Sequence, residues 1–588
     1  MIMNFRKIKL INFQDNFEFI NFSITNDFGN VDKGYGHTNE DFSMPDAVWI
    51  VHELDGLNLI KKTAPGSVVV AVIRSEFTDG EILELPFDLK KYFMDEKLMV
   101  VYGGEVEEQA ALCSSLIDID KFRGWKPFFE IETIEKDLAY FKTFYRSLGA
   151  KLNVKNLYKN TSIHTTHIFL RNALINAPLM HNKIKISDYY NSLSSKPFLI
   201  VAAGPSLNKQ LPILAKYQEY FNILAVDTVW PILDKFGIKP DLVFALDSRS
   251  KPSWPRNCVA DETCFSIDIG CAPKLVWSHD QNHLFSSTSE QIRSLLEYLG
   301  VEVDVLATGG SVATSAFNFA RYLGGNPIIL IGQDLALTGG KDHADGYLHV
   351  YSDALLKSKS ESGFDVDGYY GDRVKTESQL LYYKTWYEEQ VKAHPDIMVI
   401  NSTEGGAKIE GCLQIPFQTV CDELQKTNIS KSFIFPKYKM VFNSQHLLEL
   451  VTKVDELIEG VKGFVELSQK GELLIEKQEV LSISKRLKKI DQINADLMGY
   501  DKNVRFSVDA FSQLKMEEIR IQVVTDKSEK NIDKAIDKYR QVYVGIQESG
   551  HQCLVMLDQI QTLYRRLSDL QFYDPALLDE IFPSHSGS

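Results

Sequence analysis

The chain has 588 residues and a formal net charge of −15, and 44% of its residues are hydrophobic and 24% charged. This length exceeds what one hydrophobic core normally serves, so two to four domains are expected. The acidic balance argues against a nucleic-acid-binding protein, which usually carries a basic patch.

Two features bear on the compartment. The segment Met1–Phe13 lacks the continuous apolar stretch of a signal peptide, and no window is long and apolar enough to span a bilayer. The seven cysteines are scattered, with no Cys-x-x-Cys pair. This pattern indicates reduced thiols, and neither a zinc site nor a disulfide framework. A cytoplasmic protein without a membrane or nucleic-acid partner is therefore expected.

The first part of the chain, residues 1–180, is expected to be an α/β domain. Short β-like runs at Ser67–Ile73 and Lys97–Tyr102 alternate with helical stretches such as Ile134–Leu148. No motif in this region points to a function.

The central part, residues 181–430, contains six apolar runs that predict strands. They are Phe198–Ala203, Asn222–Val226, Leu242–Leu246, Cys264–Ile267, Val303–Ala307 and Pro327–Ile331. Most are separated by spacers of roughly helix length, and a helix is expected at Leu207–Tyr217. The alternation predicts a parallel, Rossmann-like sheet with right-handed crossovers. In such sheets ligands bind outside the carboxyl ends of the strands.

The last part, residues 431–588, is predicted to be all helical. Apolar residues recur at helical spacing in Gln445–Leu467, Glu472–Leu497 and Ile532–Leu567. Such stripes usually form the core of a helical bundle, and a docking face for a protein partner is the alternative interpretation.

Two strand ends in the central part combine a glycine with the start of a helix. Gly204-Pro205-Ser206 follows the first run, and Thr308-Gly309-Gly310-Ser311 follows the fifth. Glycine lets a ligand approach the backbone, and the N-terminus of a helix favours a phosphate. Ser206 could equally be a plain helix N-cap. Neither turn matches the P-loop or the G-x-G-x-x-G dinucleotide pattern.

Acidic residues and histidines follow the other strand ends. Asp227, Asp247 and Asp334 could bind ribose hydroxyls, an exocyclic amine or a metal, or could cap the next turn. His343 lies about ten residues beyond Gln333-Asp334, where a loop histidine could accept a proton; His349 is an alternative.

Two Asp-x-Asp pairs have the spacing that many sugar-nucleotide transferases use to hold a divalent metal. The pair Asp118 and Asp120 lies outside the array of strand ends and is interpreted as accidental. The pair Asp365 and Asp367 lies in a segment rich in glycine and tyrosine that is better read as a loop over the site. A divalent metal is possible on this pattern, but none is assigned.

Six motifs occur in this order along the chain. They are Ala203-Gly204-Pro205-Ser206-Leu207-Asn208, Ala225-Val226-Asp227-Thr228, Leu246-Asp247-Ser248, Gly309-Gly310-Ser311-Val312-Ala313, Gly332-Gln333-Asp334-Leu335-Ala336 and Asn401-Ser402-Thr403-Glu404-Gly405-Gly406-Ala407. Together they resemble the motility-associated factor (Maf) family of flagellin glycosyltransferases. The resemblance covers roughly residues 196–415, and the flanking regions match only in general layout.

The resemblance implies three domains, the central one similar to bacterial sialyltransferases. It implies transfer of a nonulosonic acid, of the pseudaminic or legionaminic type, from a CMP-activated donor to Ser or Thr of flagellin. No cofactor beyond this donor is assigned, and a divalent metal stays an open alternative. The implied nucleotide-sugar-binding residues are Gly204, Pro205, Ser206, Asn208, Asp227, Asp247, Gly310 and Ser311. The candidate catalytic residues are Gln333, Asp334 and His343.

The sequence departs from the sialyltransferase-like pattern in one respect. Those proteins use a histidine base downstream of the glycine-aspartate strand end, whereas the comparable stretch here, residues 371–376, contains no histidine. His343 and Asp334 are therefore the candidates for the base. Arg249 and Lys341 are candidates for the donor's carboxylate.

Two other functions fit parts of the sequence. A pterin-type pyrophosphokinase using ATP and magnesium shares a similar central fold, and the strand-end aspartates could hold its metal. A non-catalytic assembly factor would instead bind flagellin through the helical region. The large flanking regions suit a macromolecular acceptor better than a small-molecule kinase.

Overall fold

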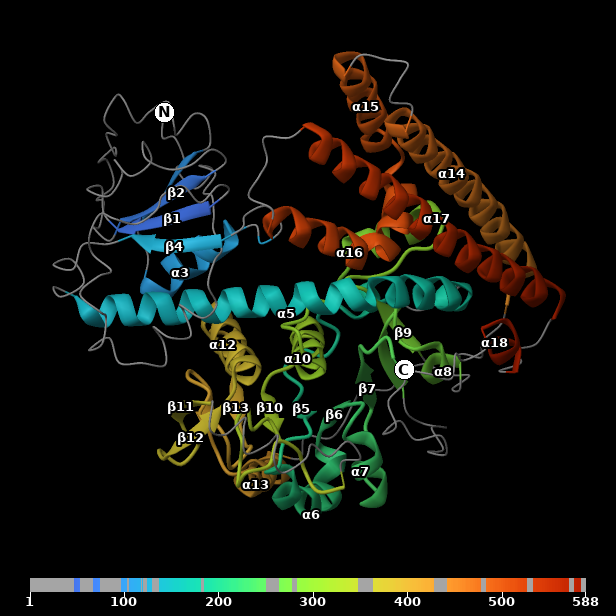
Figure 1. Cartoon of the computed structure of the whole chain (residues 1–588). Helices are drawn as coiled ribbons and strands as arrows, with labels where there is room; N and C mark the ends of the chain where they lie inside the picture. Colours follow the sequence, from blue (N-terminus) through green and yellow to red (C-terminus); the bar gives the residue numbers. More distant parts are fainter. Residues whose placement is uncertain are drawn as a thin grey trace, which may run out of the picture. The chain divides into compact units, whose positions relative to one another are not determined.

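The structure is a computed structural model of the whole chain (Figure 1). It describes residues 47–52, 67–73, 97–102, 105–117, 119, 124–128, 137–180, 185–249, 264–277, 283–346, 363–427, 442–476, 483–525, 532–570 and 576–582. The chain divides into two compact units, Met1–Asn160 and Thr161–Ser588. The three-domain division made from the sequence stays a prediction.

The first unit contains a four-stranded parallel sheet in the order β3-β2-β1-β4. Its elements are β1 Ala47–His52, β2 Val68–Ile73, β3 Leu98–Tyr102, α3 Val106–Ser115 and β4 Gly124–Phe128. All six residues of β2 are buried, as expected for a strand covered on both faces. The two β-like runs of the sequence analysis are thus confirmed as β2 and β3. The helix expected at Ile134–Leu148 is the much longer α5, Leu138–Asn176.

The second unit is built on an eight-stranded parallel sheet in the order β14-β13-β10-β5-β6-β7-β8-β9. Its strands are β5 Phe198–Val201, β6 Asn222–Val226, β7 Leu242–Ala245, β8 Cys264–Asp268, β9 His283–Ser286, β10 Ile328–Ile331, β13 Val399–Asn401 and β14 Leu413–Gln414. A separate antiparallel pair joins β11, Phe364–Asp367, to β12, Arg373–Thr376. The predicted parallel α/β class is therefore confirmed.

The strand order reverses direction at β5. From β5 the chain steps through β6, β7, β8 and β9, and β10 then returns to the opposite side of β5. Because parallel crossovers are right-handed, helices on the two arms cover opposite faces of the sheet. Figure 1 shows α6, α7 and α13 on one side and α10 and α12 on the other. The carboxyl ends of β5 and β10 therefore flank a topological switch point, where ligands bind in open α/β sheets.

The helices around this sheet are short. They are α6 Leu207–Tyr217, α7 Trp230–Lys235, α8 Pro273–Trp277, α9 Glu290–Tyr298, α10 Val312–Tyr322, α12 Ser378–Ala393 and α13 Phe417–Thr427. Short 3-10 turns occur at Ala177–Met180, Ile186–Tyr189 and Gln218–Tyr220. The helix predicted at Leu207–Tyr217 has the bounds of α6. Helix α10 packs across β5, β6, β7 and β10.

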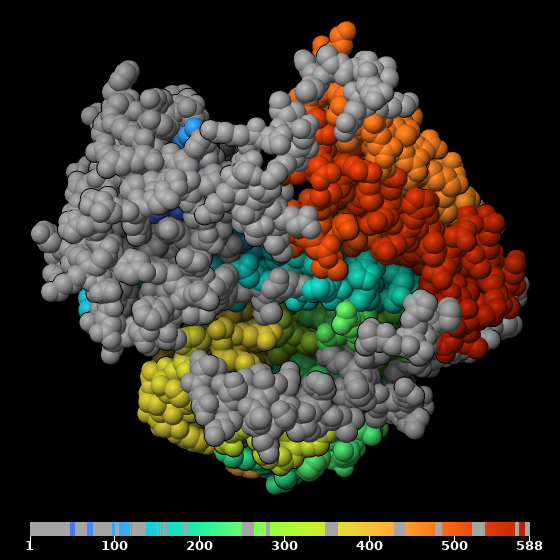
Figure 2. All heavy atoms as spheres, viewed as in Figure 1, coloured from blue at the N-terminus to red at the C-terminus, as the bar shows by residue number. Residues whose placement is uncertain are grey.

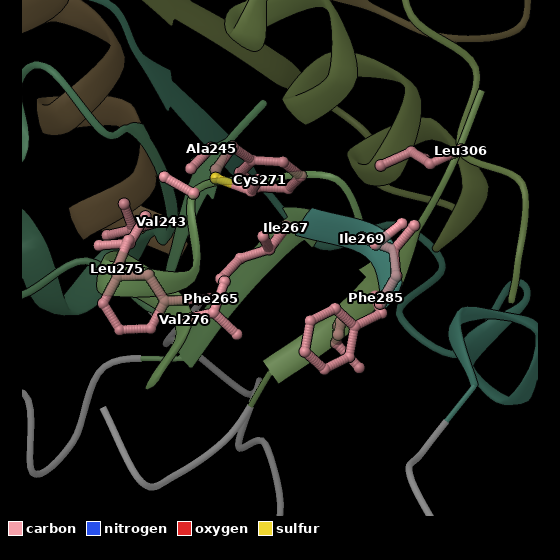
Figure 3. Packing of buried hydrophobic residues seen from close by; sticks show 14 of the residues in the cluster. Val243, Ala245, Phe265, Ile267, Ile269, Cys271, Leu275, Val276, Phe285 and Leu306 are labelled. Atoms are coloured by element: carbon pink, nitrogen blue, oxygen red, sulfur yellow. The ribbon is translucent and has the colours of Figure 1, made fainter. Parts of the chain in front are cut away.

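The core of the sheet is formed by side chains from neighbouring strands. Figure 3 shows Phe265 and Ile267 of β8 packed with Val243 and Ala245 of β7 and with Cys271. All five are buried, which accounts for the continuous apolar runs of these strands.

One predicted strand is wrong. In the run Val303–Ala307 only Asp304 forms a bridge, with Ser286, and Val305 is 60% exposed. The edge position belongs instead to β9, whose short sequence His-Leu-Phe-Ser was not predicted as a strand. Strands β13 and β14 were missed as well, because three and two residues carry too little pattern.

The C-terminal region is helical, as predicted. Its helices are α14 Ser444–Glu476, α15 Ile483–Met498, α16 Lys502–Thr525, α17 Ile532–Asp569 and α18 Ala576–Ile581. The expected helix Glu472–Leu497 covers the end of α14, at Glu476, and nearly all of α15, from Ile483; residues 477–482 lie outside the described residues. Buried Leu450, Val454 and Leu457 of α14 confirm the predicted apolar face, and α17 packs along α14. In the described parts, no helix combines the length and apolar character needed to cross a membrane.

Candidate functional site at the switch point of the sheet

Asp334, just beyond β10, is bound to the turn that follows β5. Its carboxylate accepts hydrogen bonds from the Ser206 N–H at 3.2 Å and from the Ser206 hydroxyl at 2.7 Å. Only 3% of Asp334 and 2% of Ser206 are exposed. The two strand ends nominated from the sequence, Gly204-Pro205-Ser206 and Gly332-Gln333-Asp334, therefore meet in space.

Glycines make this close approach possible. A Cβ at Gly204 would lie closer than 3.0 Å to the Asp334 carboxylate and to the Gly332 carbonyl oxygen. A Cβ at Gly406 would come equally close to the backbone of Asp334, and Gly406 also has a φ of +68°. Both positions need glycine, since any side chain would push Asp334 away from Ser206.

The Asp334 carboxylate changes what the Gly-Pro-Ser turn can do. The sequence suggested that the N-terminus of α6 would hold a phosphate, but a carboxylate of the chain already accepts from the Ser206 N–H. Ser206 is not a side-chain cap of α6 either, since its hydroxyl donates to Asp334. Burial raises the pKa of Asp334, and the hydrogen bonds from Ser206 oppose this shift. These contacts indicate that Asp334 fixes the shape of the switch point.

A loop after β10 brings His343 to the same turn. The Ala344 N–H donates to the Ala203 carbonyl oxygen at 2.8 Å, next to Gly204. The Asp345 N–H donates to Asn208 Oδ1 at 3.2 Å. His343 Nδ1 lies 3.2 Å from Asp342 Oδ1, and the His343 side chain is 30% exposed. The loop thus places a partly exposed histidine beside a carboxylate, which is how a general base is oriented.

Lys341 and His349 were the other candidates near His343 in the sequence. Lys341 forms an exposed ion pair with Asp345 at 2.7 Å. His349, the alternative histidine, lies outside the described residues.

Gln333 is held from two sides. Its N–H donates to Thr403 Oγ1 at 3.2 Å, and its side-chain oxygen accepts from the Tyr387 hydroxyl at 3.3 Å. Gln333 is 7% exposed. The segment containing Thr403 is itself fixed by Gln210 of α6, whose side-chain amide donates to the Thr403 carbonyl at 2.7 Å. The Asn-Ser-Thr-Glu-Gly-Gly segment, residues 401–406, therefore supports the switch point.

Three strand-end aspartates gather around Cys271. Burial raises the pKa of the Cys271 thiol, and the charges of Asp227, Asp247 and Asp268 raise it further. The carboxyl ends of β6, β7 and β8 therefore converge, as the sequence predicted for Asp227 and Asp247. Asp268, which directly follows the run Cys264–Ile267, was not among the site residues predicted from the sequence.

Asp268 is a buried acid that joins two strand ends. Its Oδ1 accepts from the Gly270 N–H at 2.8 Å. Burial raises its pKa to about 6, against hydrogen bonds from Gly270, Thr288 and Ser287 and the charge of Arg293. A carboxyl group that titrates near neutrality is one mark of a functional site, although structural networks produce the same effect.

This shift predicts a pH-dependent stability. Between pH 4 and 6 folded Asp268 keeps a proton that the unfolded chain releases, so this carboxyl's contribution falls as pH rises through that window. At two pK units, the loss is about 3 kcal/mol once the pH exceeds 6. Thermal unfolding of wild type and Asp268→Asn from pH 4.5 to 7.5 should show the variant gaining relative stability up to pH 6 and no further. A constant difference across this range would contradict the assignment.

The Thr308-Gly309-Gly310-Ser311 turn satisfies its own backbone groups. The Gly309 and Ser311 N–H groups donate to Thr314 Oγ1 at 2.8 and 3.2 Å, and the Gly310 N–H donates to Thr308 Oγ1 at 3.1 Å. Ser311 is the N-cap of α10 and accepts from the Thr314 N–H. This turn, like the first, is already saturated by the chain's own groups.

Helix α12 connects this turn to the aspartates. The Tyr383 hydroxyl donates to the Gly310 carbonyl at 3.0 Å, and burial raises the pKa of Tyr383, with a smaller contribution from Asp247. The Trp386 ring lies so close to Gly309 that a Cβ there would come within 3.0 Å of it. Tyr383 and Trp386 were not found from the sequence, because nothing in α12 marks which face meets the turn.

The last 16 residues of α5 hold the loops after β7 and β8. Asn172 Nδ2 donates to the carbonyl oxygens of Ser248 at 2.7 Å and Gly270 at 3.0 Å. Asn176 Nδ2 donates to those of Ile269 and Cys271. Both asparagines are fully buried. Two asparagines four residues apart, with three apolar residues between them, were a signal available in the sequence.

The structure argues against a metal role for one Asp-x-Asp pair. Asp365 and Asp367 of β11 form ion pairs with Lys375 and Arg373 of β12 on an exposed hairpin. The other pair, Asp118 and Asp120, lies outside the described residues. Within the residues that the structure covers, no three His, Cys, Asp or Glu side chains are grouped to hold a metal ion.

The sheet order and the site together define a doubly wound α/β domain with a candidate site at its switch point. A family described as "6-hydroxymethylpterin diphosphokinase MptE-like" matches residues 171–340. The chain is similar to the solved structure of the Maf glycosyltransferase from Magnetospirillum magneticum AMB-1. The TM-score is 0.51 at 14% identity, over 91% of this chain and 82% of that one. The resemblance expected from the sequence is thus confirmed at the level of the fold.

Two uncharacterized proteins of Treponema pallidum (strain Nichols) are also similar. One is 56% identical over 67 residues, which are 10% of this chain and only 17% of that protein. The other is 26% identical over 171 residues, which are 28% of this chain and 76% of that protein. Neither name carries a function.

Proposed function

We propose that the protein is a glycosyltransferase that moves a nonulosonic acid from a CMP-activated donor to Ser or Thr hydroxyls of flagellin. The observation that carries the proposal is the meeting of four sequence-predicted elements, Gly204, Ser206, Asp334 and His343, at the switch point of the sheet. The likeness to a Maf glycosyltransferase over 91% of the chain supports it. The six motifs of the sequence resemblance support the donor, the acceptor and a role in motility.

The proposed reaction needs little covalent chemistry from the protein. The acceptor oxygen forms a bond to the anomeric carbon of the sugar, and the bond from that carbon to the phosphate oxygen of CMP breaks. CMP leaves with the bonding electrons, so the site must orient it and offset its developing charge. The hydroxyl proton goes to a base, for which His343 beside Asp342 is best placed.

The remaining nominated residues have supporting roles in this proposal. Gly204, Pro205 and Asn208 shape the wall of the donor site, and Asp227 and Asp247 face the ribose or base. Ser206 and Asp334 lock two strand ends together, and Gly310 and Ser311 form the opposite wall. Gln333 is fixed by Thr403 and Tyr387 and orients the acceptor.

A second candidate is a pterin-type pyrophosphokinase, because the MptE-like family matches residues 171–340. This match covers only the sheet domain up to the loop after β10. The helical region from α14 onward is not needed by a small-molecule kinase and suits a macromolecular acceptor.

A thermal-shift assay separates the two candidates. A ligand that binds only the folded protein raises its unfolding temperature, by an amount equivalent to about 2.7 kcal/mol at a hundredfold excess over Kd. Protection by CMP or CMP-N-acetylneuraminic acid supports the glycosyltransferase. Protection only by ATP with magnesium supports the kinase. Mass spectrometry of flagellin co-expressed with this protein and a donor pathway then tests the acceptor, and unmodified flagellin would contradict it.

A further inference from the structure

The donor proposed above carries negative charge, and the two glycine turns do not offer free backbone donors to receive it. The Ser206 N–H is bound to Asp334, and the N–H groups of Gly309, Gly310 and Ser311 are bound to Thr308 and Thr314. Asp227, Asp247 and Asp268 add negative charge at the neighbouring strand ends. An anionic ligand at this edge therefore needs cationic side chains.

Two arginines are held together at this edge of the sheet. Arg249 lies two residues after Asp247, in the loop that follows β7, and Arg171 lies on α5. The buried Asn172 side chain joins the two segments, since its Nδ2 donates to the Ser248 carbonyl at 2.7 Å. Arg171 Nη2 lies 3.5 Å from Asn172 Oδ1, which draws the guanidinium toward the same loop. Arg171 and Arg249 are thus each adjacent in sequence to one partner of the hydrogen bond between Asn172 and Ser248.

Neither arginine is neutralised by the protein. Both are exposed, and in the described parts of the chain no carboxylate forms an ion pair with Arg171 or Arg249. Two neighbouring cations without a carboxylate partner repel each other, and an anionic ligand would relieve this repulsion.

His167, one helical turn before Arg171, lies beside both charges. Burial lowers its pKa below 6.5, and the charges of Arg171, Arg249 and His164 lower it further. The His167 ring contacts Phe511 of α16 at a centroid distance of 5.6 Å. In Figure 2 α5, in teal, remains visible between the red C-terminal helices and the green residues of the sheet domain. The pKa of His167 should therefore change when an anion binds beside the two arginines.

We infer that Arg171 and Arg249 form an anion subsite that binds a carboxylate or phosphate group of the donor, with Asn172 as the positioning residue. Arginine suits this role because its planar guanidinium forms paired hydrogen bonds to either group. The identity of the donor rests on the proposed function. The two anionic groups it carries are the carboxylate of the acid sugar and the phosphate of CMP.

Calorimetric titration distinguishes these two sources. CMP and CMP-N-acetylneuraminic acid are titrated into wild type, Arg171→Gln/Arg249→Gln, and Lys216→Gln. The last is a matched loss of charge at the far end of α6. We expect the double variant to bind the CMP-sugar about ten- to a hundredfold more weakly, because charge-assisted bonds are lost. Unchanged CMP affinity assigns the carboxylate, and an equal loss for CMP assigns the phosphate. Wild-type affinity for both would overturn the subsite.

A second readout separates this inference from the proposed function. The pKa of His167 is followed by NMR while wild type is titrated with N-acetylneuraminic acid, its methyl ester, or sodium phosphate. We expect an anion to raise this pKa, since it offsets the two arginines. The double variant should lose this response to anions, and the neutral ester should have no effect. If anions act on His167 but no CMP-sugar binds, the subsite stands and the glycosyltransferase proposal fails. If no anion changes His167, the subsite is wrong.

Discussion

Replacing Gly204 with alanine should release Asp334 from Ser206 and loosen the whole switch point. The new Cβ would lie within 3.0 Å of the Asp334 carboxylate and of the Gly332 carbonyl oxygen. The Asp334 carboxylate can rotate away. The Gly332 carbonyl cannot, because it belongs to the backbone that follows β10 and accepts the Gly204 N–H at 2.7 Å. Overpacking costs about 1–3 kcal/mol, and the loss of charged hydrogen bonds costs about 1.5–3 kcal/mol more. We expect about 2.5–6 kcal/mol in total.

Hydrogen exchange measures this loss locally, which matters because a chain with two compact units is not expected to unfold in one step. Peptides covering β5 and α6 should exchange faster in Gly204→Ala, whereas peptides of α14 and α17 should keep their wild-type rates. Ser206→Ala removes only the hydroxyl bond to Asp334 and should give a smaller increase in exchange. CMP should no longer slow exchange in Gly204→Ala.

Gly545→Ala is the matched control. Gly545 lies within α17, and a Cβ there would approach only flexible side-chain ends, Lys515 Cγ at 3.3 Å and Met516 Cε at 3.4 Å. Alanine is favoured over glycine in a helix by about 1 kcal/mol, so this change should leave exchange around α6 untouched. Wild-type exchange of α6 in Gly204→Ala would show that the turn tolerates a side chain, and the close packing described here would be wrong.

The sheet could be predicted from sequence because each long strand is buried on both faces. An apolar run that ends in glycine or aspartate marks each of the strands β5, β6, β7, β8 and β10. This pattern follows from the central positions of these strands in the sheet. The edges could not be predicted in the same way. β9, β13 and β14 are short, and the apolar run at Val303–Ala307 contributes one bridge residue, Asp304, instead of a strand.

The sequence predicted which residues form the site, but not the hydrogen bonds between them. Sequence order places Ser206 and Asp334 at strand ends, and parallel topology brings those ends together. Nothing in the sequence shows that the Asp334 carboxylate takes the N–H where a phosphate was expected, because the pairing depends on atoms 128 residues apart. The support from Tyr383 of α12 was missed for the same reason, because its partner is a backbone carbonyl. The support from α5 did leave a signal in the sequence, the buried pair Asn172 and Asn176.

Replacing His343 with alanine should abolish most of the transfer while leaving donor binding intact. A positioned general base contributes about a hundredfold to ten-thousandfold in rate, so we expect kcat to fall within that range. Asp342→Asn keeps the shape but removes the charge beside Nδ1, and should cost about tenfold because the imidazole is then less well oriented. Transfer is measured by mass spectrometry of flagellin incubated with the donor, and binding by titration with CMP.

The control is His551→Ala, which removes an exposed histidine of α17 whose Nδ1 lies 2.6 Å from the Gln547 carbonyl oxygen within its own helix. It should transfer at the wild-type rate.

The split between kcat and binding is what distinguishes a base from a structural residue. Ala344 and Asp345 hold the loop to Ala203 and Asn208 through their backbone N–H groups, so the loop should stay in place without the imidazole. Full transfer by His343→Ala would show that another residue acts as the base. Asp334 would be a poor substitute, because its carboxylate is buried and already accepts from Ser206. Lost CMP binding in His343→Ala would instead make this histidine part of the donor site, and the assignment as base would fail.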